Sequence, residues 1–332
     1  MPCTWRSSKT CYPRYHNGYI ILESTSFCWK FNLSMGLQKC LSLPVFVVLL
    51  VIGFVYHTIM FLVIEPWLSL RTVSGLFNGT LFTMLSFMVL LSYGLAVLRD
   101  PGQVPASYMP EIEDSDTVLH EVKRKGGDLR YCQKCRHYKP PRAHHCRVCK
   151  RCVLRMDHHC VWINNCVGHN NYKPFFLFVV YVVGACIQAL ILLGGHTMQH
   201  FGAEEQNLYI HGAPPLSTSV AVSALLKVLC ATMLLPLLVA LAVLLIWHVY
   251  LALHNKTTIE YHEGVRARWL AEKAGQSYRH PYNLGIFSNL SMVFGPNSTC
   301  WFCPTSLSHI GPGIRFQTMY DKVTRSEFHL GG

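Results

Sequence analysis

Four long apolar segments constrain the fold of this 332-residue chain more than any other feature. They lie near 44–64, 77–98, 174–196 and 228–252. A helix needs about 20 apolar residues to cross the hydrocarbon core of a bilayer. The alternative, a set of buried helices in a large soluble protein, agrees poorly with segments this long and almost free of charge. We therefore predict an all-α polytopic membrane protein with four transmembrane helices.

Basic residues are distributed unevenly among the segments that flank these helices. The loop after the first helix carries only Arg71, and the loop 197–219 has no Lys or Arg, whereas 1–43, 99–173 and 253–332 are rich in both. Loops rich in Lys and Arg stay on the cytosolic side of a membrane. Both termini and the long middle loop are therefore predicted to be cytosolic. Topology accounts for the net charge of +12, and we predict no nucleic-acid partner.

These assignments divide the chain into five regions. They are a cytosolic N-terminal segment (1–43), two transmembrane helices (44–98), a cytosolic cysteine-rich region (99–173), two further transmembrane helices with a lumenal loop (174–252) and a cytosolic tail (253–332). Residues 1–34 lack the apolar core of a signal peptide, and we expect a flexible extension there. The cysteine-rich region then lies in a reducing compartment, where disulfides are disfavoured.

A fourteen-residue repeat organises the cysteine-rich region. Each unit has the form Cys-x2-Cys-x9-His-x6-Cys, and the two units interleave. The first unit comprises Cys132, Cys135, His145 and Cys152, and the second comprises Cys146, Cys149, His159 and Cys166. Three thiolates and one imidazole are a common ligand set for structural Zn²⁺, which supplies folding energy where an apolar core is small. We therefore predict that this domain folds on two structural zinc ions.

One cysteine of the repeat, Cys160, is left without a metal site. It occupies the position of Cys146 one unit later, but Ile163 stands where its partner cysteine would be. Asp157 and His158 lie just before Cys160 and are not used by either ligand set. A thiol near a histidine and a carboxylate is the set needed for nucleophilic catalysis. A spare zinc ligand and a regulatory thiol are the alternatives.

The segment Asp157-His158-His159-Cys160, in a cysteine-rich region between the second and third of four spans, resembles the DHHC-type protein S-acyltransferases, and plant members most of all. Other motifs of the family follow in order: Asp100-Pro101-Gly102, Thr257-Thr258-Ile259-Glu260 (its TTxE motif), and a C-terminal motif with Tyr282-Asn283, Gly285, Asn289 and Phe294-Gly295. One departure is Val161, because the family usually has proline after the catalytic cysteine.

The resemblance implies a palmitoyltransferase that works through an acyl-enzyme. Cys160 would attack the thioester of acyl-CoA, above all palmitoyl-CoA, and pass the acyl group to cysteine thiols of membrane-associated proteins. His158 would act as general base, and Asp157 would orient it. The resemblance also favours the Golgi or a related endomembrane as the location, with the plasma membrane as the alternative.

Candidate contacts to acyl-CoA come from the zinc domain and the third helix. Basic residues close in sequence to Cys160 are Lys139, Arg142, Arg147, Lys150 and Arg151. They are candidates for the CoA phosphates, and attraction to anionic membrane lipid is the equally weighted alternative. The resemblance further implies that Trp162 and Ala185 contact the acyl chain, with Ala185 near the closed end of a cavity.

Two other classes of function compete with this interpretation. A membrane-anchored zinc scaffold or ubiquitin-ligase adaptor would explain the metal sites, but not an unused Cys160 beside Asp157 and His158. A transporter or channel predicts polar residues within the spans, and only Lys227, at the edge of the fourth, comes close.

Overall fold

The computed structural model describes residues 14–16, 19–22, 29–32, 42–110, 129–211, 218–306 and 311–321, with the backbone alone in 14–32 and 200–211. Within these residues, four helices are long and apolar enough to cross a membrane: Leu43–Leu68, Val73–Leu98, Tyr172–Gln199 and Thr218–Leu253. Each contains one of the four predicted segments, and the predicted architecture is confirmed.

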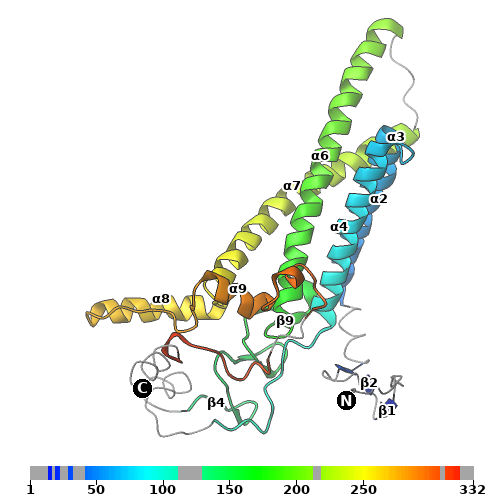
Figure 1. The fold of residues 1–332 in the computed structure, drawn as a ribbon. Helices are drawn as coiled ribbons and strands as arrows, with labels where there is room; N and C mark the ends of the chain where they lie inside the picture. Colours follow the sequence, from blue (N-terminus) through cyan, green and yellow to red (C-terminus); the bar gives the residue numbers. More distant parts are fainter. Residues whose placement is uncertain are drawn as a thin grey trace, which may run out of the picture.

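The four spans form an elongated bundle (Figure 1). The first consists of α2 (Leu43–His57), the π-helix η1 (Thr58–Ile64) and α3 (Glu65–Leu68), and the others are α4 (Val73–Leu98), α6 (Tyr172–His211) and α7 (Thr218–Leu253). Thr72 caps α4 by accepting a hydrogen bond from the backbone N–H of Gly75. Apolar side chains cover the outside of the bundle, and those of Phe46, Leu76 and Val243 are 55%, 59% and 63% exposed. These faces suit contact with lipid.

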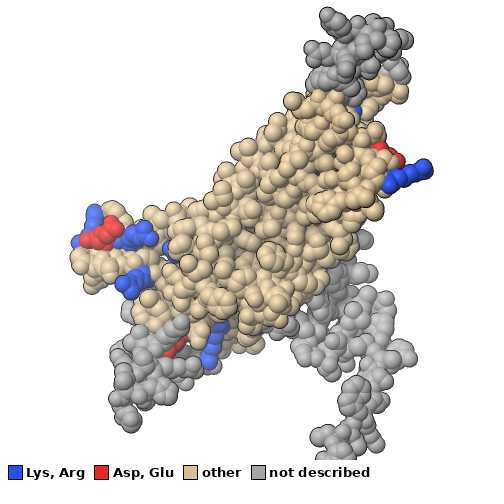
Figure 2. All heavy atoms as spheres, turned by 45° about the horizontal axis from the view of Figure 1, so that its top comes forward, with Lys and Arg blue, Asp and Glu red and all other residues tan. Residues whose placement is uncertain are grey.

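Charged side chains are concentrated toward the ends of the molecule. Figure 2 shows a broad uncharged belt over the helices, with Lys, Arg, Asp and Glu gathered mainly at the end that carries α8 (Thr258–Lys273). Such a belt is what a bilayer-spanning surface requires, because a charged side chain is costly in hydrocarbon.

The cysteine-rich region packs at one end of the bundle and is built from short antiparallel hairpins. Their strands are β4 (Tyr131–Cys132), β5 (His137–Tyr138), β6 (His144–Cys146), β7 (Arg151–Val153), β8 (His158–Cys160) and β9 (Asn165–Val167). They pair in the order β4 with β5, β6 with β7 and β8 with β9. Three further strands, β1 (Arg14–His16), β2 (Tyr19–Leu22) and β3 (Trp29–Asn32), form an antiparallel sheet where we expected a flexible extension.

A shared apolar cluster joins the cysteine-rich region, called the zinc domain below after its predicted ions, to the spans. It contains Tyr93 and Ala96 of α4, Phe175 of α6, and Ile163 and Val167 of the last hairpin, and Cys160 packs against it. The C-terminal helix α9 (Ile286–Phe294) contributes Val293 and Phe294 to the same cluster. The last hairpin, formed by β8 and β9, is therefore held directly against the end of α4 and the start of α6.

Candidate active site and metal sites

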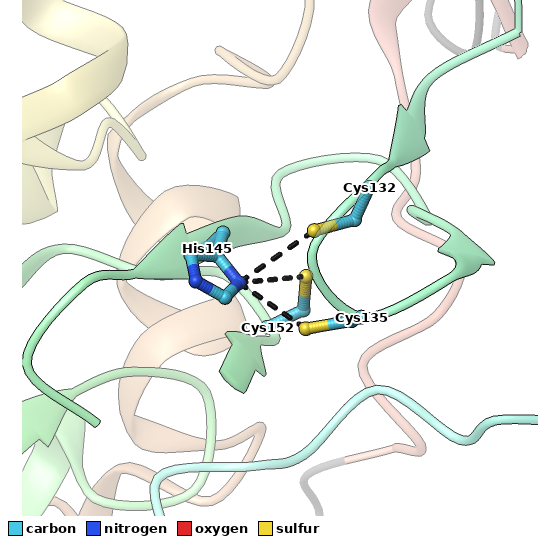
Figure 3. A group of neighbouring side chains, drawn as sticks. All are labelled: Cys132, Cys135, His145 and Cys152. Carbon is cyan, nitrogen blue, oxygen red and sulfur yellow. Dashed lines mark hydrogen bonds between the residues drawn. The ribbon is translucent and has the colours of Figure 1, made fainter. Parts of the chain in front are cut away.

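The first predicted ligand set converges on one point (Figure 3). The Nδ1 atom of His145 lies 3.6, 3.2 and 3.9 Å from the Sγ atoms of Cys132, Cys135 and Cys152. Tetrahedral Zn²⁺ with Zn–S bonds of about 2.3 Å and Zn–N bonds of about 2.0–2.1 Å separates such atoms by roughly 3.6 Å. The spacing therefore fits a Zn²⁺ ion, and the sulfurs form no disulfides.

The second ligand set has the same geometry. The Nδ1 atom of His159 lies 3.7, 3.5 and 3.6 Å from the sulfurs of Cys146, Cys149 and Cys166. Strand pairing brings together two of the four ligands in each set, because His145 lies opposite Cys152 and His159 lies opposite Cys166 in their hairpins. The other two come from the Cys-x2-Cys turn. The two interleaved units of the sequence thus become two groups of four that could each hold a metal ion.

The repeat continues into a third hairpin that has no metal site. The strands β8 and β9 lie fourteen positions after β6 and β7 and pair in the same register. The backbone follows the repeat too: Arg136, Lys150 and Asn164 each adopt positive φ, at 56°, 54° and 44°. In this third turn Ile163 replaces the second cysteine and is 0% exposed. An apolar anchor thus substitutes for the metal, and Cys160 keeps the position of a metal-binding thiolate.

Cys160, His158 and Asp157 form a connected group. The Oδ2 atom of Asp157 lies 2.7 Å from Nδ1 of His158. Burial raises the pKa of the Cys160 thiol, but hydrogen bonds from His158 and from the backbone N–H groups of Ile163 and Trp162 outweigh it, and the pKa is lowered overall. Equivalent bonds hold metal thiolates in the other turns, since the Cys149 N–H lies 3.3 Å from the Cys146 sulfur.

The environment of His158 favours its protonated form. Burial lowers the pKa of His158, but hydrogen bonds with Asp157 and Cys160 raise it to about 9. Burial raises the pKa of Asp157, and the hydrogen bond and charge of His158 bring it below its ordinary value. The group therefore suits a thiolate–imidazolium pair backed by a carboxylate, and the resting histidine already holds the proton that a general base would take.

The TTxE segment binds the same carboxylate from a distant part of the chain. Thr258 donates from its backbone N–H to Oδ1 of Asp157 and from its hydroxyl to Oδ2, each over 2.9 Å. Thr257 and Glu260 form a capping box that begins α8: the Thr257 hydroxyl accepts from the Glu260 N–H, and the Glu260 carboxylate accepts from the Thr257 N–H. The motif is both a helix start and a brace for Asp157.

One of the predicted CoA contacts, Arg142, has a structural role in the fold. Arg142 is only 3% exposed, and its guanidinium donates to both carboxylate oxygens of Glu260 over 2.6 and 2.8 Å. It also donates to Asn255 and lies 4.2 Å from the ring centroid of Tyr282. Arg142 therefore joins the zinc domain to α8, and its donors are engaged within the protein.

Comparison with known proteins agrees with this geometry. The DHHC palmitoyltransferase family matches residues 125–265, which include both ligand sets, Cys160 and Glu260. The chain is 57% identical over 285 residues to probable protein S-acyltransferase 16 of Arabidopsis thaliana, covering 86% of this chain and 96% of that protein. The chain belongs to the DHHC palmitoyltransferases.

More distant members extend the similarity. The chain is 44% identical over 269 residues to probable protein S-acyltransferase 15 of the same plant, covering 81% of this chain and 99% of that protein. It is 34% identical over 232 residues to human palmitoyltransferase ZDHHC3, covering 68% of this chain and 73% of that protein. A transferase that S-acylates proteins is thus the function of this chain, and the zinc-scaffold and transporter alternatives fall away.

The Asp-Pro-Gly motif of this DHHC palmitoyltransferase also braces the zinc domain. Asp100 accepts a hydrogen bond from the N–H of Gly102 and forms an ion pair with Arg151 at 2.5 Å. Gly102 has φ of +103°, which disfavours other residues there. Its carbonyl accepts from the Leu154 N–H. Arg151 is thereby partly engaged, whereas Arg147 and Lys150 are exposed and Lys139 is half-buried.

A cavity lies between the spans of the DHHC bundle. It is lined by apolar side chains from α2, α4, α6 and α7, including Ala185. Tyr56 also lines it, stacked on Phe82 and hydrogen-bonded to the Thr83 hydroxyl at 3.1 Å. Trp162 lies in the turn that follows Cys160 and is 58% exposed.

Sequence analysis did not identify three polar residues that lie at this site. The Asn165 amide donates to the carbonyls of Ala96, Val97 and Arg99, which are left unpaired where α4 ends. Asn171 donates to Ala96 and Cys166. His248 lies on α7 and reaches the catalytic group. Of these three residues, only His248 could have been singled out from the sequence, because a histidine within a predicted span is unusual.

Proposed function

We propose that Cys160 is the acyl-carrying nucleophile of this protein S-acyltransferase, with His158 as its proton partner and Asp157 as the group that orients His158. The observation that carries the proposal is the 2.7 Å contact of Asp157 with His158. His158 in turn lies beside the Cys160 thiol, which belongs to neither metal-ligand set.

The chemistry divides into two thioester exchanges. The Cys160 thiolate attacks the acyl-CoA carbonyl, its C–S bond to CoA breaks, and the departing sulfur takes the proton from His158. An incoming protein thiol then gives its proton to His158 and attacks the acyl-enzyme, which releases the Cys160 thiolate. Because the two thioesters are similar in energy, positioning of the reacting atoms contributes most of the acceleration.

Acyl-CoA is the proposed cosubstrate, divided between membrane and cytosol. The acyl chain would enter the cavity that Ala185 lines, beyond Trp162, and each buried CH₂ contributes about 0.8 kcal/mol. Lys139, Arg147 and Lys150 remain the candidates for the CoA phosphates, or for anionic membrane lipid. Two zinc ions would hold the hairpins in place without taking part in the exchange.

The acyl acceptors we propose are cysteine-containing proteins at the cytosolic face of the membrane. The distribution of Lys and Arg supports cytosolic termini, and the family resemblance supports a Golgi or related endomembrane location over the plasma membrane. Epitope tags at the two termini should both be accessible after selective permeabilisation of the plasma membrane. A tag protected until the internal membranes are opened would contradict this topology.

The decisive experiment uses the purified full-length protein and labelled palmitoyl-CoA. Cys160→Ser should abolish labelling and transfer while the protein keeps two zinc equivalents. Cys303→Ser, which removes an exposed thiol outside the site, is the matched control and should label normally with hydroxylamine-sensitive acyl groups. Labelling that persists in Cys160→Ser, or loss of one zinc equivalent from it, would contradict the assignment.

A further inference from the structure

His248 is a buried histidine of the fourth span that the reaction above does not use. It lies five residues before the end of α7 at Leu253, where the span meets the zinc domain, and is only 2% exposed. A buried polar side chain in a membrane helix is costly unless it is partnered. The Tyr172 hydroxyl, at the start of α6, lies 3.2 Å from Nδ1 of His248 and supplies that partner.

The other contacts of His248 all lead to the catalytic histidine. Its ring centroid lies 5.9 Å from that of His158 and 5.1 Å from that of Phe175. Phe175 packs against His158 in turn, with centroids 5.3 Å apart and planes at 70°. Phe175 and His248 therefore form an aromatic wall beside the imidazole of His158, and this wall is built by two membrane helices.

Such a wall supplies a constraint that Asp157 does not. Asp157 holds His158 through a single contact at Nδ1, and a ring held at one atom can still swing about that contact. Contacts along the ring remove this freedom and keep the second nitrogen aimed at Cys160. A misplacement of about 1 Å in a reacting group can cost roughly 10²-fold in rate.

We propose that His248 is a positioning residue, which holds the His158 imidazole in line with Cys160 and is itself fixed by the Tyr172 hydroxyl. This inference rests on the proposed role of His158. The Tyr172 ring in turn lies under the guanidinium of Arg155, 5.3 Å from its centroid, so the wall is continuous with the buried polar network of the zinc domain.

The same side chains do not suit a third metal site. Donor atoms of Asp157, His158 and His248 lie within 4.8 Å of one another. However, the Asp157 carboxylate already accepts two hydrogen bonds from Thr258 and one from His158. A metal ion would have to break the contact that orients His158.

The test compares variants of the full-length protein in single-turnover acylation by palmitoyl-CoA. His248→Phe keeps a ring in the wall but removes the nitrogen that faces Tyr172, and Tyr172→Phe removes only the hydroxyl. We expect about a tenfold lower maximal rate for the first and a smaller loss for the second, with unchanged half-saturation and two zinc equivalents in both. His248→Gln, which can still accept from Tyr172, should recover part of the rate. His254→Phe, another histidine near the end of α7, should behave as the parent.

If His248 acts by positioning His158, its substitution should not affect the reactivity of Cys160 once His158 is absent. A general loss of stability would lower that reactivity with or without His158. Alkylation of Cys160 by iodoacetamide proceeds even without His158, so it can be measured in every background. We expect Tyr172→Phe and His248→Phe to slow alkylation in the parent, but not when combined with His158→Ala. Equal slowing in both backgrounds, or a parental rate for both single variants, would overturn the inference. If His158→Ala alone retained the parental acylation rate, the proposed role of His158 would fail instead.

Discussion

At the scale of single residues, Cys160, the proposed nucleophile, occupies a turn built like those of the two ligand sets. Cys160 stands where Cys132 and Cys146 stand in the two ligand sets, and the backbone N–H groups that follow point at its sulfur. Ile163 replaces the metal as the anchor of the turn. A conformation that stabilises metal thiolates thus stabilises a free thiolate, which is the nucleophilic form of cysteine.

Neighbouring histidines should then respond to substitution in opposite ways. His159→Ala removes a ligand and should release one zinc equivalent and destabilise the fold, because a structural zinc site contributes about 10 kcal/mol or more of apparent binding energy. His158→Ala should keep both zinc equivalents and slow acylation by about 10²–10⁴-fold. Metal analysis and single-turnover acylation on the two purified variants check this. If His158→Ala released zinc and His159→Ala only slowed acylation, the assignment of His159 as ligand and His158 as proton partner would be wrong.

At the scale of elements, the start of α8 connects the catalytic group to the fold. Its capping box orients Thr258 toward Asp157, while Glu260 pairs with Arg142. This ion pair is buried, so loss of either partner would leave an uncompensated charge, at a cost of about 3–5 kcal/mol. A short helix terminus therefore contacts both Arg142 of the zinc domain and the carboxylate of Asp157.

Thr258→Val tests how much the Thr258 hydroxyl contributes to the contact with Asp157. The backbone N–H still donates to Asp157, but the side-chain hydrogen bond to the carboxylate is lost. A hydrogen bond to a charged group contributes about 1.5–3 kcal/mol, so we expect acylation to slow by roughly tenfold or more. Thr258→Ser restores the hydroxyl and should recover most of the rate. An unaltered rate in Thr258→Val would show that the backbone contact alone orients Asp157.

Glu260→Gln tests the ion pair as a stability element. Arg142 would keep its bonds to Asn255 and at most one bond to position 260, and it would lose the opposite charge, so the melting temperature should fall. Glu263→Gln, another carboxylate on α8, is the control and should melt close to the parent. Thermal unfolding of both variants in detergent provides the measurement. Equal melting temperatures would mean that the pair contributes little net stability.

At the scale of the whole molecule, the four spans line the cavity, and the zinc domain places Cys160 at one end of the bundle. Ala185 lines this cavity thirteen residues after the start of α6 at Tyr172, which is about 20 Å along a helix. That depth matches the distal part of a chain of about 16 carbons, and the small alanine leaves room for longer ones.

Ala185→Phe should therefore shift acyl-CoA preference from chains of about 18 carbons toward shorter ones by overfilling the cavity. Ile187→Phe, two residues further along the same helix, is the matched control, because Ile187 is 45% exposed on the outer face of the bundle. Competition between acyl-CoAs of different lengths measures the preference. An active Ala185→Phe variant with the parental length profile would remove Ala185 from the acyl site.

The sequence by itself determined the four spans, the two ligand sets and the odd cysteine, because each is a local pattern: an apolar length or a fourteen-residue spacing. Only the tertiary structure decided which distant side chains meet. Arg142 pairs with Glu260 across 118 positions, and Asp157 meets Thr258 across 101. His248 comes to His158 because α7 returns to the end of the bundle where the zinc domain packs. No spacing predicts such contacts, since they depend on how helices and hairpins pack. For the same reason, Arg142 looked like a phosphate ligand in the sequence and is a buried structural cation in the fold.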